Sequence, residues 1–345
     1  MVREIIISKL SKTEKIRNMA NLNTSYIGLQ LKNPLIVSSS GLTDNPDKVK
    51  KAAEAGAGAV VLKSLFEEQI NFEAGRLING NQSGYPEAMD YIRNYSKSNS
   101  LDEYLALIEN AKKSVDIPVI ASINCVSVND WIGFSKQIEA AGADALELNA
   151  YFIPTDKKRD SGSYEKMYFD LAARVKETVD IPVALKLGSN FTNLIHIITQ
   201  LYFRKVEGVV LFNKFYEPDI DVNKLKFRPG GVFSNPSDIS RTLRWTSIIS
   251  DQVPNIDIAA STGVHDGKSA VKLLLAGATT VQVCSILYKN GVNFLQTMLQ
   301  DIESWMNDQG FETVDNFRGR LNYGHIIDPA VYERSQFMRY FSNYT

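Results

Sequence analysis

One short pattern occurs three times in the chain and constrains its fold more than any other feature. Residues 54–62, 140–148 and 275–283 each pass from a helix-like end through Ala-Gly-Ala into an extended apolar run. The glycine suits the left-handed terminus of a helix, and the small residues beside it let a strand enter between packed helices. The three copies predict helix-to-strand connections of one kind along the chain.

Short apolar runs alternate with longer segments that can form helices, which is typical of βαβ units and a parallel sheet. Pro118 and Pro182 open two of these runs, where a missing N–H does no harm. Eight such units in 345 residues favour an α/β fold, a single-domain (β/α)8 TIM barrel. A doubly wound open sheet is the alternative, but no G-x-G-x-x-G follows an early strand. The candidate strands are 35–39, 59–63, 119–124, 145–149, 183–187, 208–213, 256–260 and 280–285.

Charge and composition exclude several classes of partner. The net charge is −1, with lysines and arginines scattered among acids, which argues against nucleic acid and against an anionic membrane. No run approaches the ~18 apolar residues that a membrane-spanning helix needs. Cys125 and Cys284 lie in apolar runs and no leader precedes the chain, so we expect a cytoplasmic protein. Dispersed histidines and cysteines give no metal-ligand spacing, so we expect no metal.

The first 18 residues are charged and precede Met19, which resembles a natural start. We expect residues 1–18 to form a loose N-terminal extension and residues 19–345 to form the barrel. A membrane-associating helix is the alternative for the extension, but its apolar residues are few and bunched.

Polar residues stand where the predicted strands stop, and in a barrel of this kind chemistry sits at those carboxyl ends. Each could simply cap a turn. Two lysines in such places would be costly to bury without an anionic or electron-rich ligand. The strand-end residues are Ser38–Gly41, Lys63, Ser64, Asn124, Asn149, Lys186, Asn213, Lys214, Ser261–Gly263, Cys284 and Ser285.

The last two of these clusters stand where such barrels often bind phosphate. Gly263 would let the main chain approach phosphate oxygens, and a helix starting near Asp266 would present its positive end. His265 could contact phosphate or cap that helix. We expect His196 to pack in an apolar helix, and His325 has no candidate interaction partner nearby in the sequence.

From residue 22 onward these motifs resemble the dihydroorotate dehydrogenase family, in particular its soluble class 1 branch. The similar segments are 22–25, 32–40, 55–64, 147–149, 185–187 and 277–283, and 314–321 resembles the family's C-terminal helix. The resemblance implies a barrel that holds FMN, oxidises dihydroorotate to orotate in pyrimidine biosynthesis, and forms a homodimer.

Residue by residue, the resemblance assigns roles to the strand-end side chains. Asn149 and Asn213 would donate hydrogen bonds to the substrate, and the cation of Lys186 would stabilise reduced flavin. The flavin ring and ribityl chain would meet Ser39, Lys63, Ser64, Asn124, Asn149 and Lys186, and the phosphate would meet Gly263, Cys284 and Ser285, with Ser234 in the nearby loop 233–236.

The residue that should remove a proton from the substrate differs from the family's pattern. The family uses Cys or Ser, and by simple register Phe152 occupies that place. Tyr151 is the nearest substitute: a cation such as Lys63 could lower its pKa from about 10. Alternatively, Tyr151 stacks over a ligand or closes the mouth of the site. Cys125 reads as a core residue rather than a substitute thiol.

Three functions therefore stay open at this point. The first is an FMN-dependent dihydroorotate dehydrogenase with hydride passing to flavin N5, and the second is a flavoprotein for another dihydro-heterocycle or enoate. The third is a catalytically silent flavin or metabolite binder. The electron acceptor could be fumarate, or NAD through a partner. A flavin barrel that modifies tRNA would need a basic face, which the sequence lacks. The loop 212–221 could be an active-site lid or a packing loop.

Overall fold

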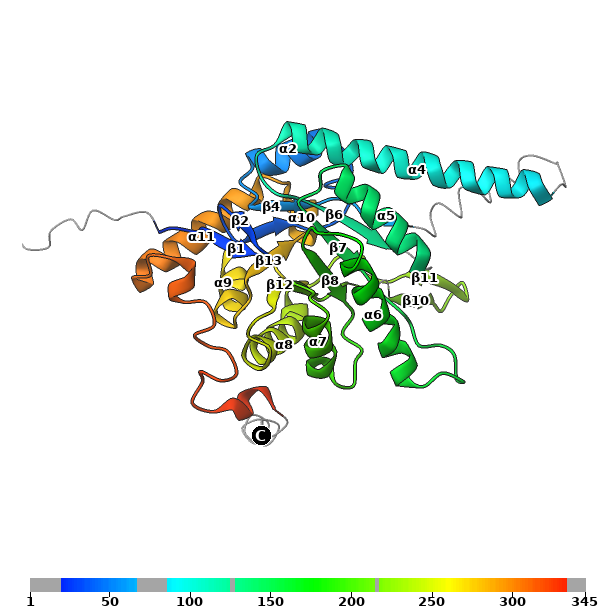
Figure 1. Cartoon of the computed structure of the whole chain (residues 1–345). Helices are drawn as coiled ribbons and strands as arrows, with labels where there is room; N and C mark the ends of the chain where they lie inside the picture. Colours follow the sequence, from blue (N-terminus) through cyan, green and yellow to red (C-terminus); the bar gives the residue numbers. More distant parts are fainter. Residues whose placement is uncertain (1–19, 67–85, 125–127, 215–216, 334–345) are drawn as a thin grey trace, which may run out of the picture.

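A computed structural model describes residues 20–66, 86–124, 128–214 and 217–333 (Figure 1). The predicted extension 1–18 and Cys125 lie outside the described residues. None of the helices in the described ranges is long and apolar enough to cross a membrane.

The described strands of the main sheet run parallel and close into a barrel. Their order is β4-β3-β13-β12-β9-β8-β7-β6-β5, and a further pairing of β4 with β6 closes the ring, with β5 continuing the line of β4. This closed order confirms the predicted (β/α)8 barrel and excludes an open sheet. The strands are β3 (Leu35–Val37), β4 (Ala59–Val61), β5 (Leu65–Phe66), β6 (Val119–Asn124), β7 (Ala145–Asn149), β8 (Val183–Leu187), β9 (Gly208–Leu211), β12 (Asp257–Ser261) and β13 (Thr280–Val283).

Helices follow the strands and cover the outside of the barrel (Figure 1). Several begin where an Asn or Asp side chain accepts a backbone N–H of the first turn, as Asn45, Asp160 and Asp266 do. The helices are α2 (Pro46–Glu54), α4 (Pro86–Ser114), α5 (Val128–Ala140), α6 (Ser161–Lys176), α7 (Leu194–Phe203), α8 (Ile239–Gln252), α9 (Gly267–Leu275), α10 (Ser285–Asn290) and α11 (Phe294–Gln309).

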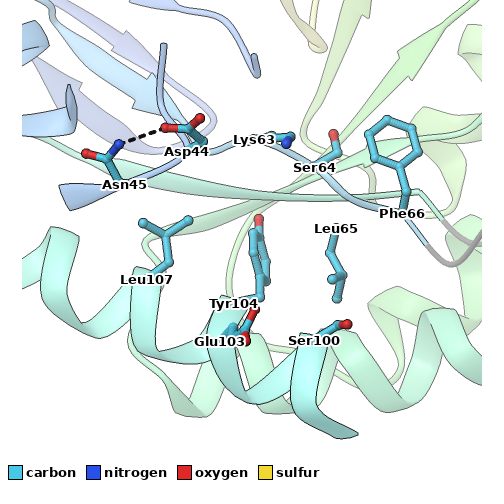
Figure 2. A pocket seen from close by; sticks show the side chains of 10 residues that line it. All are labelled: Asp44, Asn45, Lys63, Ser64, Leu65, Phe66, Ser100, Glu103, Tyr104 and Leu107. Carbon is cyan, nitrogen blue, oxygen red and sulfur yellow. Dashed lines mark hydrogen bonds between the residues drawn. The ribbon is translucent and has the colours of Figure 1, made fainter. Parts of the chain in front are cut away.

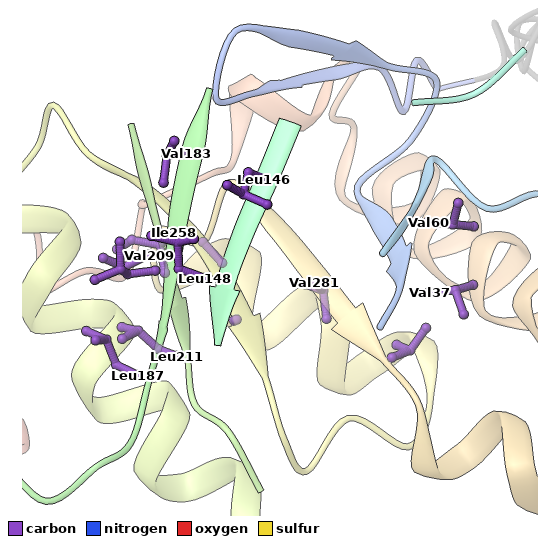
Figure 3. Close-up of a cluster of buried hydrophobic side chains, with 14 of the residues drawn as sticks. Val37, Val60, Leu146, Leu148, Val183, Leu187, Val209, Leu211, Ile258 and Val281 are labelled. Atoms are coloured by element: carbon purple, nitrogen blue, oxygen red, sulfur yellow. The ribbon is translucent and has the colours of Figure 1, made fainter. Parts of the chain in front are cut away.

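Alternation along each strand divides the buried residues into two cores. Leu146 and Leu148 of β7 belong to the large cluster between strands and helices, part of which Figure 3 shows. Ala145 belongs to a smaller cluster inside the barrel, with Ile36, Ala59 and other strand residues. The residues that share a face with Ala145 are Glu147 and Asn149, so this strand delivers polar groups to the barrel interior.

A hairpin closes the amino end of the barrel. Strands β1 (Thr24–Tyr26) and β2 (Leu29–Leu31) pair antiparallel. Tyr26, Ile27 and Leu31 pack against the interior cluster, and the Ile27 N–H donates to Asp257 Oδ2 over 2.5 Å at the start of β12. The apolar hairpin residues therefore fill the end of the barrel opposite the polar strand ends.

Two segments differ in detail from the expectations. Residues 314–321 were expected to form a helix, but only Val314–Asn316 forms a 3-10 turn (η2), and Gly319 adopts a φ of +71°. That left-handed residue prevents an α-helix from continuing. In the loop 212–221, Pro218–Asp221 (β10) pairs with Lys226–Pro229 (β11) in an exposed hairpin.

Candidate active site

A cavity of about 470 Å³ opens at the carboxyl ends of the barrel strands. Many of the residues predicted for the site line it together, although they come from different strands. Its walls include Ser38–Gly41, Lys186, Asn213, Lys214, Val232–Ser234, Ser261–Val264, Gln282, Cys284, Ser285 and Tyr288. Seven of these residues are ones to which the resemblance assigns the cofactor or the substrate, namely Ser39, Lys186, Asn213, Ser234, Gly263, Cys284 and Ser285.

Lys186 stands at the floor of this cavity, with only 6% of its surface exposed. Its Nζ donates to Ser38 Oγ over 3.1 Å and to Gln282 Oε1 over 3.2 Å. It also pairs with Glu147 Oε1 at 3.2 Å. A buried ammonium with these partners is held in one position, facing whatever fills the cavity.

Asn149 does not line the main cavity, but its side chain meets a residue that does. Asn213 Nδ2 donates to Asn149 Oδ1 over 2.6 Å. In the sheet Asn149 is also the register partner of Lys186. Two amides and one ammonium therefore gather at the ends of β7, β8 and β9, where they can bind carboxylate or ring amide groups of a ligand.

The opposite end of the cavity is rich in hydroxyls. The backbone N–H of Ser234 donates to Ser285 Oγ over 3.0 Å, and Ser234 Oγ lies 3.2 Å from His265 Nε2. Burial, followed by the positive charge of Lys289, lowers the pKa of His265. His265 is therefore a neutral partner for Ser234 near pH 7.

Gly263 is required by the local backbone. Its φ is +84°, and a Cβ placed there would lie 2.1 Å from the backbone nitrogen of Ile239 at the start of α8. Close approach of Gly263 to phosphate stays a prediction, whereas its backbone does lie against the start of α8. The cavity wall includes Cys284 and Ser285 beside α10, not the start of α9 at Asp266 that the sequence suggested.

Cys284 lies in the wall as a neutral thiol. Burial raises its pKa, although a hydrogen bond with Ser40 and the charge of Lys186 act in the other direction. A thiol with a raised pKa is a poor nucleophile. Cys284 therefore shapes the cavity rather than attacking a ligand.

Lys63 and Ser64 line a second cavity of about 430 Å³ between the end of β4 and α4 (Figure 2). Lys63 is exposed there. Ser64 keeps a link to the main cavity, because its Oγ lies 3.0 Å from Ser39 Oγ. Asn124 stays half-buried at the end of β6, in register with Phe66.

Tyr151 and Phe152 lie beside a third, aromatic cavity of about 180 Å³. The Phe152 ring meets the Tyr168 ring edge-on, with centroids 5.0 Å apart. Tyr151 also lines a polar cavity that shares Asn213 with the main one. Burial raises the pKa of Tyr151, which is the opposite of the lowering expected from Lys63, and Lys63 lines a different cavity.

Two polar residues of the barrel interior were not predicted as site residues from the sequence. Glu147 and Gln282 are 1% and 2% exposed, and Gln282 Nε2 donates to Glu147 Oε2 over 2.6 Å. A signal was present: Glu147 stands two residues before Asn149 in a predicted strand, so the two must share a face. A charged residue between two leucines of a barrel strand marks a site in the interior.

Comparison with known proteins agrees with this architecture. Residues 21–306 match the family model described as dihydroorotate dehydrogenase. The chain is 27% identical over 313 residues to the dihydroorotate dehydrogenase B (NAD(+)) catalytic subunit of Thermoplasma volcanium, covering 87% of this chain and 98% of that one. It is 26% identical over 295 residues to the protein of the same name from Methanocaldococcus jannaschii, covering 84% and 94%.

A bacterial relative shows similar coverage. The catalytic subunit of dihydroorotate dehydrogenase B (NAD(+)) from Bacillus cytotoxicus is 25% identical over 309 residues, which is 88% of this chain and 97% of the relative. The family match spans both the strands that form the barrel and the strand ends that form the cavity. The chain belongs to the dihydroorotate dehydrogenase family, whose members are oxidoreductases that act on a CH–CH group.

Proposed function

We propose that this protein binds FMN in the main cavity and transfers hydride between a CH–CH bond of dihydroorotate and the flavin. The observation that carries the proposal is the buried ammonium of Lys186 at the floor of a cavity whose walls present hydroxyls, amides and Gly263. At about 470 Å³ the cavity falls within the ~300–1,000 Å³ usual for cofactor sites.

The polar groups fit the parts of FMN. When bound, FMN supplies an acceptor for hydride. Lys186 would face the edge of the flavin ring that gains negative charge, and would stabilise that charge. Ser234, Ser285 and the main chain at Gly263 would hold the phosphate at the other end, as hydroxyl and N–H donors do. Of the remaining predicted contacts, Ser39 reaches the cavity directly, and Cys284 would pack against the ligand.

Lys63, Ser64 and Asn124 are weaker parts of this proposal. Lys63 lines the second cavity and is exposed, so it would have to turn inward to meet flavin or substrate. Ser64 would act through its contact with Ser39. Asn124 would have to reach over from the end of β6.

Asn149 and Asn213 would orient the substrate. Their mutual hydrogen bond leaves the Asn149 amide NH₂ and the Asn213 carbonyl oxygen to meet the substrate's amide groups. Lys214, which lines the same cavity, would offer a cation to a substrate carboxylate. Two amides and an ammonium suit a heterocycle that carries both ring amides and a carboxylate.

The position of Phe152 favours a second candidate, an FMN enzyme for another dihydro-heterocycle or an enoate. Phe152 packs against Tyr168 and brings no proton acceptor to the cavity. Tyr151, with its raised pKa, is better suited to donate a proton than to remove one. In that case Tyr151 would protonate one carbon of an activated double bond while hydride reaches the other.

The relatives' names point to an electron acceptor. They are catalytic subunits of an NAD(+)-dependent enzyme, so we propose that this chain also passes electrons to NAD⁺ with a partner subunit. Fumarate as a direct acceptor is the alternative. We further propose a cytoplasmic homodimer, as the resemblance to class 1 enzymes implies.

The test is an anaerobic absorbance scan of the FMN-loaded protein before and after excess dihydroorotate. Bleaching of the flavin band near about 450 nm within seconds would support dihydroorotate oxidation. The second candidate would be favoured if dihydroorotate leaves the band unbleached, a chemical reductant bleaches it, and an enoate then restores it by reoxidising the flavin. Reduced flavin that no substrate reoxidises would indicate a silent binder, and failure to take up FMN would overturn the proposal.

A further inference from the structure

Four polar side chains form a closed group beneath the main cavity, inside the barrel. Lys186 Nζ contacts Glu147, Gln282 and Ser38 at distances of 3.1–3.2 Å. Gln282 Nε2 donates to Glu147 Oε2 over 2.6 Å, and Ser38 Oγ donates to Gln282 Oε1 over 3.0 Å. Residues from β7, β8 and β13 and one residue after β3 therefore meet across the barrel.

The group is almost completely removed from solvent. Glu147 and Gln282 are 1% and 2% exposed, and Ser38 and Lys186 are 4% and 6% exposed. Water therefore screens these charges little, and their effect on a neighbouring ligand is larger than at a surface. Lys186 and Ser38 also line the cavity, whereas Glu147 does not.

The charges of the group cancel. Lys186 alone would present one positive charge to the cavity, whereas the ion pair with Glu147 at 3.2 Å presents a dipole with no net charge. A barrel interior does not need such a pair for stability, because well-packed apolar residues often do as well or better. A role in the chemistry of the ligand gives a reason for burying the pair.

We propose that Glu147 is a positioning residue that holds Lys186 Nζ toward the edge of the flavin ring and offsets its charge, and so sets the reduction potential of the flavin. This inference rests on the proposed FMN site. With Glu147 in place the flavin gains less from the ammonium when it is reduced, so it gives up its electrons more readily. Gln282 and Ser38, whose side chains are uncharged, hold the pair in place by hydrogen bonds.

A purely structural ion pair would behave differently from a device that sets a potential. If the pair were purely structural, Glu147→Gln and Lys186→Met would each leave one buried charge unpaired and loosen the site, so both would shift the potential in the same direction. If charge matters, the two substitutions act with opposite signs and cancel when combined. The sign of the shift therefore separates the two roles.

The experiment measures the flavin potential, by equilibration with reference dyes, in the FMN-loaded wild type, Glu147→Gln, Lys186→Met and the double variant. Glu147→Gln should favour reduction by about tenfold, which for two electrons is about 30 mV upward. Lys186→Met should shift the potential downward by a similar factor. The double variant should return to within about threefold of the wild type.

Glu207→Gln is the matched control, because it removes a carboxylate from an ion pair, with Lys176 at 2.7 Å, just before β9 at the amino end of the barrel and away from the cavity. Its potential should stay within about threefold of the wild type. A potential that is unchanged or lowered in Glu147→Gln, or a double variant that does not return, would overturn the proposal. If Glu147→Gln does not fold, the comparison of Lys186→Met with the double variant still decides it, since adding Glu147→Gln must then raise the potential.

Sulfite affinity provides a second readout that needs no turnover. Sulfite adds to oxidised flavin and leaves the ring negatively charged, so a nearby uncompensated cation strengthens its binding. Glu147→Gln should bind sulfite about tenfold more tightly and Lys186→Met more weakly. If the wild type binds no FMN, the proposed function and this inference are both overturned. If it binds FMN but Glu147→Gln changes neither the potential nor the sulfite affinity, only the inference is overturned.

Discussion

Asn213 Nδ2 donates to Asn149 Oδ1 over 2.6 Å and thereby joins the end of β7 to the residues after β9, across the end of β8. The two amides are therefore oriented before any ligand arrives. Preorganised amides bind a ligand without the cost of ordering their side chains.

Asn213→Ala should weaken binding of orotate to the FMN-loaded protein by about tenfold, because one hydrogen bond is lost and Asn149 is left without its partner. The change in flavin absorbance on titration with orotate measures this affinity. Asn223→Ala, in the exposed turn of the β10–β11 hairpin, removes the same kind of side chain away from the cavity. Equal affinities in the two variants would contradict the role of Asn213.

Phe152→Cys should not raise dihydroorotate turnover above that of the wild type, because Phe152 packs into the aromatic cluster beside Tyr168. Loss of the ring contact should lower the free energy of unfolding by roughly 1–3 kcal/mol. Urea unfolding and the rate of flavin bleaching check the two parts. Phe203→Cys, at a side chain that is 69% exposed, is the control for stability. A clear gain of turnover in Phe152→Cys would contradict this reading.

Gly263→Ala should destabilise the protein by roughly 2–5 kcal/mol, because the residue needs a positive φ and its Cβ would strike the backbone of Ile239. Gly310→Ala is the matched comparison: Gly310 is left-handed, with a φ of +76°, but has no atom within 4 Å of its Cβ position. It should lose only about 1–2 kcal/mol. Thermal unfolding measures both, and equal losses would show that contact with α8 is unimportant.

Tyr26→Phe should leave the protein as stable or raise its free energy of unfolding by about 1 kcal/mol, because the buried Tyr26 hydroxyl has no hydrogen-bond partner among the described residues. Tyr104→Phe should instead cost roughly 1–2 kcal/mol. The Tyr104 hydroxyl donates to Ser122 O over 2.8 Å and accepts from Ser122 N over 2.7 Å. Urea unfolding at pH 7 compares the two, and a loss in Tyr26→Phe would indicate an additional partner.

The lowered pKa of His265 should make stability depend on pH. In the unfolded chain this histidine binds a proton near pH 6.5, whereas the folded state resists protonation. The unfolded state therefore binds more protons between those two pKa values, and stability falls as the pH drops through about 6.5. His265→Gln should lose this part of the pH dependence between pH 7 and pH 5, as measured by urea midpoints. Parallel pH profiles for both proteins would contradict the assignment.

The sequence was sufficient for the barrel because its strands are short apolar runs with sharp ends. The predicted runs 145–149 and 183–187 coincide with β7 and β8. Residues 314–321 were expected to be helical because they resemble the family's C-terminal helix. In the structure the chain turns there at Gly319, which has a positive φ and whose N–H donates to Leu274 O over 3.0 Å.

The candidate site was predictable where backbone position alone decides it. Lys186, Asn213 and Ser285 stand at strand ends and meet in one cavity, as expected. Lys63 lies at a strand end too, but its long side chain can leave the barrel, and only packing decides its direction. Phe152 follows the strand in a loop, where register gives position along the chain but not the direction of the ring.

Within the described part of the chain, the hairpin of β1 and β2 determines which end of the barrel a ligand can use. Tyr26, Ile27 and Leu31 fill the amino end of the barrel, so whatever reaches Lys186 arrives and departs at the carboxyl end. A product must withdraw before the next molecule can approach along the same route. For the alternative in which fumarate is the direct acceptor, dihydroorotate and fumarate would use that opening in turn, and the product would compete with fumarate for entry.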